Sequence, residues 1–149
     1  MAIVQRTVRA TPERVFAVLA DGWSYSDWVV GTVHIRNVDP QWPQPGAQLH
    51  HKAGPWPVSL HDKSTVLAVE PDRHIRLSAG LWPLGEAIVD IRLEPVSPES
   101  TRVIMQEDFE HGPLRWIQNK ANDLLLHRRN VETLSRLADI AERATPRAL

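Results

Sequence analysis

The residues of this chain best suited to chemistry are one carboxylate and one imidazole, Glu107 and His127. Segment 101–109 alternates like a strand, which puts Glu107 on the same face as Met105 and Phe109. If that face packs on the core, Glu107 points inward among apolar side chains. His127 falls within the apolar stripe of a predicted helix. Burial disfavours a charged carboxyl and raises its pKa toward the neutral range, so the two groups could form an acid–base dyad.

Each of these two groups also has a purely structural interpretation. Glu107 could be a buried carboxylate that pairs with His127 or with an arginine and joins helix to sheet, because ion pairs also perturb pKa values. His127 could be a core histidine bonded to a backbone carbonyl, since buried polar groups normally have a partner. The sequence leaves both interpretations open.

A metal site is not expected from the histidine pattern. His50, His51 and His61 could join His127 and Glu107 as ligands, but adjacent strand residues face opposite sides, so His50 and His51 cannot both point inward. The sequence has no His-x-His or His-x-x-x-His pattern and no cysteine. It also has no nucleophile elbow, phosphate-binding glycine loop or dinucleotide fingerprint. We therefore expect neither a metal nor an organic cofactor.

The aromatic composition favours a binding cavity. The chain has 6 Trp against 1 Tyr and 2 Phe, and indole rings offer wide apolar surfaces with a single donor. Trp56 and Trp82 fall at predicted loop tips, where they could close a cavity, and Trp28 and Trp116 lie deeper. Alternatively, the loop tryptophans cover the open end of the core without touching a ligand. The predicted ligand contacts are Trp28, His51, Trp56, Trp82, Met105, Phe109, Trp116 and Leu124.

Two helical signals of unequal length bracket a strand-rich middle. Thr11 is a good N-cap and Pro12 suits the first helical position, so a short helix follows the first strand, and Ser24–Trp28 predicts a second short helical turn. Residues 114–143 contain no Gly or Pro, enough for a helix about 45 Å long. Short connections make the strands antiparallel. The predicted strands span 3–10, 32–38, 47–53, 58–69, 73–80, 86–94 and 101–109, with a loop at 95–100.

The long helix is predicted to be amphipathic. His127 lies in its apolar stripe, three residues after Leu124 and four before Val131, and Leu134 lies at the border. Because such a stripe packs on the sheet, His127 should face the interior. The stripe residues are Ile117, Ala121, Leu124, Val131 and Ala138.

Length and charge bound the class of protein. At 149 residues the chain fits one domain, 1–149, with room for a sizeable core. A formal charge of −1 offers no basic face for nucleic acid and no polybasic membrane anchor. No segment approaches a membrane span, and the first residues lack the apolar region of a signal peptide. We therefore expect a cytoplasmic protein without stable membrane association.

Several short segments, taken in their order along the chain, carry a family resemblance. They are Thr11–Phe16, Asp21–Trp28, Pro45–Gly46, Thr101–Glu107 and His127–Asn130. In this order the chain resembles the START-like helix-grip superfamily, also called SRPBCC, and within it the polyketide cyclase/dehydrase family. The resemblance implies an α+β fold in which a seven-stranded antiparallel sheet wraps around a long C-terminal helix, with two short helices after the first strand. It also implies a cavity that binds an apolar or aromatic molecule.

Three functions are compatible with the sequence. The first is binding of a small hydrophobic, lipid or aromatic molecule, with no nucleic-acid partner. The second is a cofactor-free cyclase, dehydratase or aromatase in which Glu107 and His127 move protons on a poly-β-keto-like substrate. Some aromatase/cyclases of the family are thought to hold substrate oxygens with an arginine, and no inward strand position here is a clear arginine. The third is a protein–protein interaction module, and the sequence leaves monomer and homodimer equally open.

Overall fold

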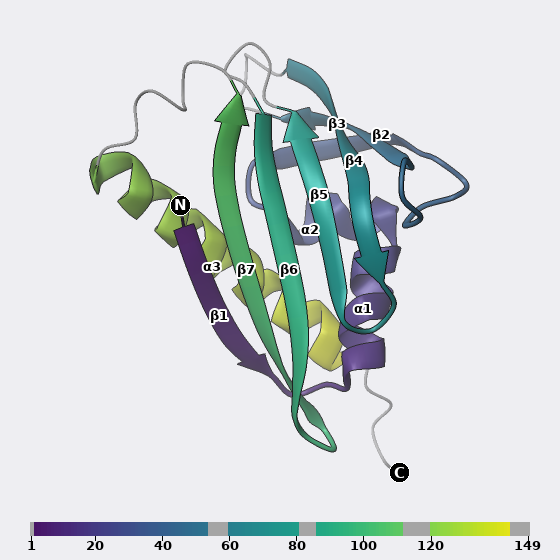
Figure 1. Cartoon of the computed structure of the whole chain (residues 1–149), viewed down its shortest axis with the longest axis vertical. Coiled ribbons are helices and arrows are strands. Elements are labelled where there is room, and N and C mark those ends of the chain that lie inside the picture. The colour runs from purple at the N-terminus through teal and green to yellow at the C-terminus, as the bar shows by residue number, and fades with distance from the viewer. Residues whose placement is uncertain (1, 54–59, 81–85, 112–119, 144–149) are drawn as a thin grey trace.

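The computed structural model describes residues 2–53, 60–80, 86–111 and 120–143. These residues form seven strands in one antiparallel sheet, in the order β1-β7-β6-β5-β4-β3-β2, together with a long C-terminal helix (Figure 1). The predicted architecture is therefore confirmed. The strands are β1 Ala2–Val8, β2 Thr32–Val38, β3 Gln48–Ala53, β4 Leu60–Glu70, β5 His74–Gly80, β6 Glu86–Ser97 and β7 Ser100–His111. The helices are α1 Pro12–Ala20, the 3₁₀ turn η1 Gly22–Ser24, α2 Tyr25–Trp28 and α3 Lys120–Arg143.

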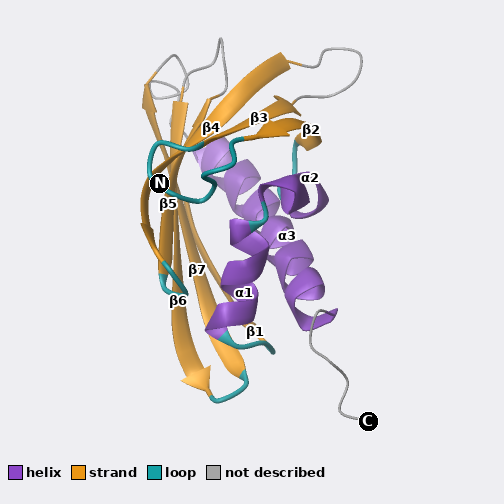
Figure 2. Ribbon diagram, turned by 90° about the vertical axis from the view of Figure 1, so that its right-hand side faces the viewer, coloured by secondary structure: helices purple, strands orange, loops and turns teal. Residues whose placement is uncertain are grey.

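Strands β1 and β2 lie at opposite edges of the sheet, although the short helices alone separate them in sequence. Those helices therefore carry the chain from one edge to the other, and the later strands return one by one until β7 pairs with β1. All three α-helices lie on one side of the sheet, which curves around them (Figure 2). An antiparallel sheet can pack one face and expose the other, and here the helices cover the inner face.

Most element positions agree with the sequence pattern, with one exception. β2 has the predicted bounds, and Thr11 caps α1 by accepting a hydrogen bond at Oγ1 from Arg14 N at 3.4 Å. The predicted loop at 95–100 is wrong, because β6 runs to Ser97 and β7 begins at Ser100. The register shifts between Pro95 and Ser97. A proline is tolerated at such a bulge, so Pro95 does not end the strand.

An aromatic cluster fixes the short helices beneath the sheet. The ring centroids of Tyr25 and Trp28 lie 4.5 Å apart, and the Tyr25 and Trp42 rings meet edge to face at 5.4 Å. Tyr25 Oη and Trp42 Nε1 both donate to the Leu19 carbonyl, at 2.8 and 3.2 Å. Trp28 Nε1 donates to Ser24 Oγ at 3.1 Å. The polar atoms of these rings are thus used within the protein, which leaves their flat faces for apolar packing.

Helix α3 buries a different face from the one predicted. Its buried residues are Asn130, Thr133, Leu134, Leu137, Ala138 and Ala141. Leu124 and Val131, assigned to the buried stripe, are exposed, and Leu134, assigned to the border, is buried. The predicted stripe passed through the apolar residues Val131 and Leu124, whereas the buried face passes through the polar residues Asn130 and Thr133. The predicted first residues of this helix, 114–119, lie outside the described residues.

Side chains of α3 accept hydrogen bonds from backbone N–H groups of two other segments. Thr133 Oγ1 accepts a hydrogen bond from Val30 N at 3.2 Å, in the segment between α2 and β2. Glu142 Oε1 accepts one from Arg9 N at 3.0 Å, just after β1. These contacts hold the C-terminal half of the helix against the segment after α2 and the segment after β1. None of the described helices combines the length and apolarity needed to cross a membrane.

The buried face of α3 predicts how two leucines on this helix differ. Leu137 is 0% exposed and Leu125 is 66% exposed. We expect Leu137→Ala to lower the free energy of unfolding by about 2–5 kcal/mol, because it removes core contacts and leaves a cavity. Leu125→Ala, the matched control, should change it by less than about 0.5 kcal/mol. Urea unfolding followed by circular dichroism measures both, and equal losses would contradict the observed face.

Candidate functional site

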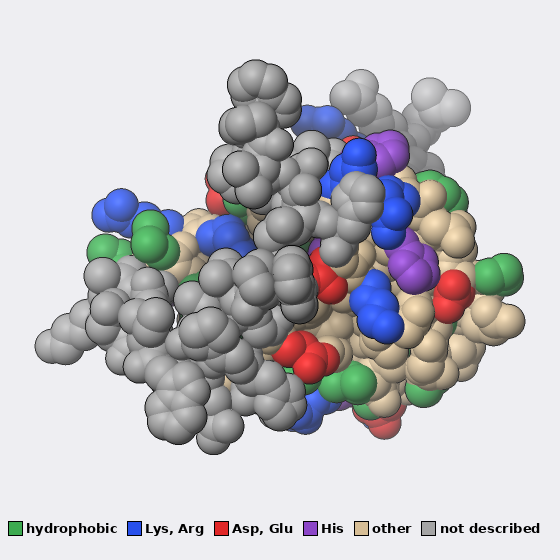
Figure 3. Space-filling view, turned by 90° about the horizontal axis from the view of Figure 1, so that it is seen from above, with side chains coloured by type: hydrophobic (Ala, Val, Ile, Leu, Met, Phe, Trp, Pro, Cys, Tyr) green, Lys and Arg blue, Asp and Glu red, His purple; other side chains and the backbone are tan. Residues whose placement is uncertain are grey.

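A cavity of about 360 Å³ lies between the inner face of the sheet and the helices. It lies toward the end where β5 and β7 finish, at the top of Figure 1. Seen from above, the described surface at that end carries side chains of both charges and histidines (Figure 3). The described lining residues are Tyr25, Trp28, Val29, Val30, Gly31, Thr32, Leu49, His51, Ser64, Leu77, Ala79, Gly80, Val89, Ile91, Met105, Glu107, Phe109 and Arg129.

Apolar groups make up most of this wall. Strand alternation brings them there, since inward residues of β5, β6 and β7 such as Leu77, Ile91 and Met105 point to one side. Tyr25 and Trp28 add aromatic rings from α2 whose polar atoms are already bonded elsewhere. Small-molecule sites are typically such apolar clefts with a few placed polar groups. The wall therefore has the composition of a ligand site.

An ion pair crosses the cavity wall from sheet to helix. Arg129 of α3 donates from Nη2 to both carboxylate oxygens of Glu107 on β7, at 2.9 and 3.3 Å. The Glu107 side chain is 2% exposed and that of Arg129 is 32% exposed. Among the described residues, Arg129 Nε is buried without a hydrogen-bond partner. The carboxylate is thus buried, while one guanidinium N–H has no partner in the described ranges.

Burial and the ion pair act on Glu107 in opposite directions. Burial raises the pKa of Glu107 above its ordinary value, and the positive charge of Arg129 lowers it by a smaller amount. The strand neighbours of Glu107, Ala2 on β1 and Val89 on β6, bring no charge. A carboxyl in apolar surroundings loses hydration that a single partly exposed cation does not restore. Glu107 therefore holds a proton more readily than a surface glutamate does.

A second polar group on the wall is His51 of β3. Its Nε2 lies 3.3 Å from Ser64 Oγ on β4, and among the described residues its buried Nδ1 has no hydrogen-bond partner. Burial lowers the pKa of His51, with smaller opposed effects from Asp62, which raises it, and from Arg36 and His50, which lower it. The ring is therefore neutral at neutral pH, able to donate or accept depending on its tautomer.

The structure separates the two predicted catalytic residues. Glu107 lines the cavity, as its strand alternation indicated. His127 is exposed on α3, so its predicted place in the buried stripe is wrong, and Arg129 takes the position of partner to Glu107. The buried face of α3 lies about one residue around the helix from the predicted stripe. His127 therefore points outward, and Arg129 lies at the border of the buried face. Glu107 pairs with an arginine, as its structural interpretation allowed, and its catalytic role stays a prediction.

The predicted ligand contacts divide into three groups. Trp28, His51, Met105 and Phe109 line the cavity, and their contact with a ligand stays a prediction. Leu124 is exposed and is not among the lining residues, so its predicted place facing the interior is wrong for the same reason as that of His127. The remaining predicted contacts lie outside the described residues; they are Trp56, Trp82 and Trp116.

Sequence reasoning missed Arg129 and Ser64. Arg129 lies four residues before Thr133, so a correctly placed stripe would have put it at the edge of the buried face. Ser64 is directly opposite Leu49 in the β3–β4 register, which places it on the inward face beside His51. That register was the missing information, because cross-strand pairing cannot be read from either strand alone.

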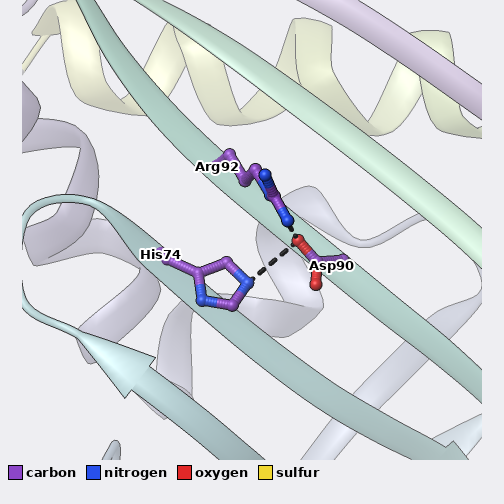
Figure 4. A network of polar contacts seen from close by, with 3 residues as sticks. All are labelled: His74, Asp90 and Arg92. Atoms are coloured by element: carbon purple, nitrogen blue, oxygen red, sulfur yellow. Dashed lines mark hydrogen bonds and ion pairs between the residues drawn. The ribbon is translucent and has the colours of Figure 1, made fainter.

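Polar side chains also gather outside the cavity. No group of three or more His, Asp or Glu side chains suited to a metal ion occurs within the described ranges. Figure 4 shows Asp90 bound by His74 Nε2 at 2.9 Å and by Arg92 Nε at 3.3 Å. His74 and Arg92 also border an open groove of about 670 Å³ at the opposite end, lined by charges of both signs. The cavity is more enclosed and far more apolar, and we take it as the candidate site.

Comparison with known families gives the class of the protein. Residues 1–142 match the family described as polyketide cyclase / dehydrase and lipid transport, and the chain belongs to that family. The predicted family is thereby confirmed. A comparison with curated proteins finds no match.

Solved structures support the same fold. The Zhui aromatase/cyclase from Streptomyces sp. R1128 is 18% identical, with a TM-score of 0.74 over 98% of this chain and 95% of that one. A protein from Arthrobacter aurescens is 16% identical, with a TM-score of 0.73 over 96% and 86%. Protein CV1439 from Chromobacterium violaceum is 19% identical, with a TM-score of 0.67 over 94% and 96%. These likenesses concern the fold, and with the family they confirm the predicted START-like helix grip.

The raised pKa of Glu107 predicts a pH-dependent effect of Glu107→Gln. A carboxyl with a higher pKa in the folded state stabilises the fold at acid pH, and this contribution is lost as pH rises from about 4.3, the ordinary value, through the raised value. Glutamine does not titrate. We therefore expect the stability of Glu107→Gln relative to the unmodified protein to increase with pH across that interval. Chemical unfolding between pH 4 and 8 measures this difference, and a constant difference would contradict it.

Proposed function

We propose that this protein binds a compact, largely apolar or aromatic small molecule in the cavity beneath the sheet. The observation that supports it is a partly enclosed space of about 360 Å³ with a mainly apolar wall. This volume is at the small end of the roughly 300–1,000 Å³ usual for small-molecule sites. It therefore favours a compact ring system over a long extended chain.

The physical basis of binding is burial of apolar area against a preformed wall. Each Å² removed from water contributes about 25 cal/mol, and the rings of Tyr25 and Trp28 offer faces for stacking. An unfilled cavity also favours ligand binding over the interaction-module alternative, which a filled or collapsed interior with a large exposed apolar patch would have favoured. Family membership is in agreement with this proposal, because the family description includes lipid transport.

Blocking the cavity tests the binding proposal. Ala79 lines the cavity on β5, and Arg76 on the same strand is exposed on the outer side. We expect neutral aromatic compounds to raise the melting temperature. At a ligand concentration of one hundred times Kd, the free energy of unfolding should increase by about 2.7 kcal/mol. Ala79→Phe should abolish this shift and Arg76→Phe should preserve it, once circular dichroism shows both variants folded. Failure of aromatic and fatty-acyl compounds alike to shift the unmodified protein would reject the proposal.

A second candidate is cofactor-free proton transfer on a ketone bound in the cavity. The observation that favours it is the position of Glu107, a buried carboxyl with raised pKa in contact with the cavity and with Arg129. Ionised Glu107 would take a proton from the carbon next to a carbonyl. The Arg129 guanidinium would stabilise the negative charge that develops on the carbonyl oxygen. The predicted partner His127 is replaced by Arg129 in this version of the acid–base proposal.

Deuterium exchange tests the catalytic candidate without knowledge of the natural substrate. A bicyclic ketone such as 2-tetralone serves as a minimal analogue of a folded poly-β-keto chain, and NMR in D₂O follows loss of its α-protons. We expect Glu107→Gln to reduce the protein-dependent exchange rate by about 10²–10⁴-fold, the usual contribution of a general base. Asp139→Asn, on the exposed side of α3, is the control. Unchanged exchange in Glu107→Gln would eliminate this candidate.

A further inference from the structure

We propose that the outer face of strands β2, β3 and β4 binds an oligophosphate, a chain of linked phosphate groups carried by a soluble small molecule. The site lies on the opposite face of the sheet from the cavity, so it stands independently of the proposed binding function. Five residues form it, and together we call them the basic patch. They are His34 and Arg36 on β2, His50 and Lys52 on β3, and Lys63 on β4.

The register of the sheet brings the basic patch together from three strands. Lys52 lies opposite His34 of β2, and His50 lies opposite Lys63 of β4. His51, between Lys52 and His50, lines the cavity, and strand alternation therefore directs its two neighbours to the outer face. Adjacent strands are about 4.8 Å apart, so the side chains share a small area. In the view from above, Lys, Arg and His side chains lie close together on the right-hand side (Figure 3).

Arg36 adds a guanidinium at the edge of the sheet. It is exposed on β2, where the register shifts between Ile35 and Asn37. Arg36, Lys52 and Lys63 thus place three permanent positive charges on adjacent strands. The two histidines of the basic patch add ring nitrogens that can donate hydrogen bonds. The basic patch therefore offers several donors to one multiply charged anion.

The basic residues on the rest of the outer face are paired with carboxylates. On β5 and β6, His74 and Arg92 both bind Asp90, and Arg102 of β7 lies 3.6 Å from Glu94. By contrast, no side chain of the basic patch forms an ion pair within the described ranges. The positive charge of the basic patch is therefore available to an external anion.

Two acidic residues next to the basic patch in sequence are directed elsewhere. Asp62 lies opposite His51 in the β3–β4 register and so faces the inner side of the sheet. Asp39, just after β2, accepts a hydrogen bond at Oδ2 from Gln48 N at 2.9 Å. The formal net charge of −1 therefore conceals a local excess of positive charge, because a net charge says nothing about how the charges are distributed.

An oligophosphate fits the basic patch better than the alternative anionic partners do. Linked phosphates concentrate negative charge in a small volume, and Arg and Lys are their usual partners. Strands β2, β3 and β4 contain no Trp, Tyr or Phe, the side chains on which single-stranded nucleic acid stacks. Polybasic membrane sites typically use about 4–8 Lys or Arg residues, more than the basic patch has. Protein partners usually meet an apolar centre. A small polyanion is therefore the favoured ligand.

Titration of the whole ¹⁵N-labelled protein with tripolyphosphate, followed by NMR, tests the proposal. We expect saturable shifts of the amide signals of β2, β3 and β4 around the basic patch, and weaker binding as salt is added, because salt screens exposed charges. Inorganic phosphate should bind about tenfold more weakly, since one phosphate reaches fewer of the five residues. Absence of saturable shifts, or shifts spread evenly over the surface, would overturn the proposal.

Variants that remove one exposed charge show whether the basic patch is the site. Arg36→Gln and Lys63→Gln should each raise the Kd of tripolyphosphate about threefold, and the double variant about tenfold, as expected for exposed ion pairs. Arg128→Gln removes the same charge from an exposed position on α3 and should leave the Kd unchanged. An equal loss of affinity in Arg128→Gln would overturn the proposal, because binding would then follow net charge alone. Tighter binding to vesicles of phosphatidylcholine and phosphatidylserine, at equal phosphate concentration, would overturn it in favour of a membrane surface.

Discussion

The constraint on which this structure depends is the need to cover the apolar inner face of a curved sheet with few helices. α3 lies beneath the β1–β7 side and packs there through leucines and alanines such as Leu137 and Ala141. The short helices fill the space beside it, fixed by the hydrogen bonds that converge on the Leu19 carbonyl. Toward the end where β5 and β7 finish, these elements do not fill the interior, and the cavity remains. The same packing of helices against the sheet therefore forms the core and leaves the cavity.

The Glu107–Arg129 pair lies where the packed core meets the cavity. A buried pair often adds little net stability, because desolvation offsets attraction, but ionised Glu107 without Arg129 would be an uncompensated buried charge. Glu107 on the sheet therefore depends on Arg129 of the helix. This links the position of α3 to the electrostatics of the cavity wall. A shift of the helix that weakened the pair would also change which charges a ligand meets.

The sequence was sufficient for the fold and for half of the site. Alternation in segment 101–109 placed Met105, Glu107 and Phe109 on the inward face, because strand periodicity is two and tolerates no ambiguity. The helix was harder, since its buried face includes the polar residues Asn130 and Thr133. A stripe drawn through apolar residues alone follows Leu124 and Val131 into solvent. The pairing of Arg129 with Glu107 depends on how the helix packs on the sheet, so the helix sequence alone does not predict it.

Recognition in this cavity depends on which polar groups the fold has already used. The hydroxyl of Tyr25 and the indole N–H of Trp28 are bonded to the protein, so these large rings contribute shape and apolar area. His51 and Arg129 are each oriented by a neighbour, Ser64 and Glu107, while another nitrogen of each has no hydrogen-bond partner within the part of the chain that the structure describes. Apolar walls discriminate weakly between ligands of similar size, whereas buried polar groups left unpaired discriminate strongly. In the proposed binding function, discrimination between ligands of similar size would therefore rest on the few polar groups of the wall.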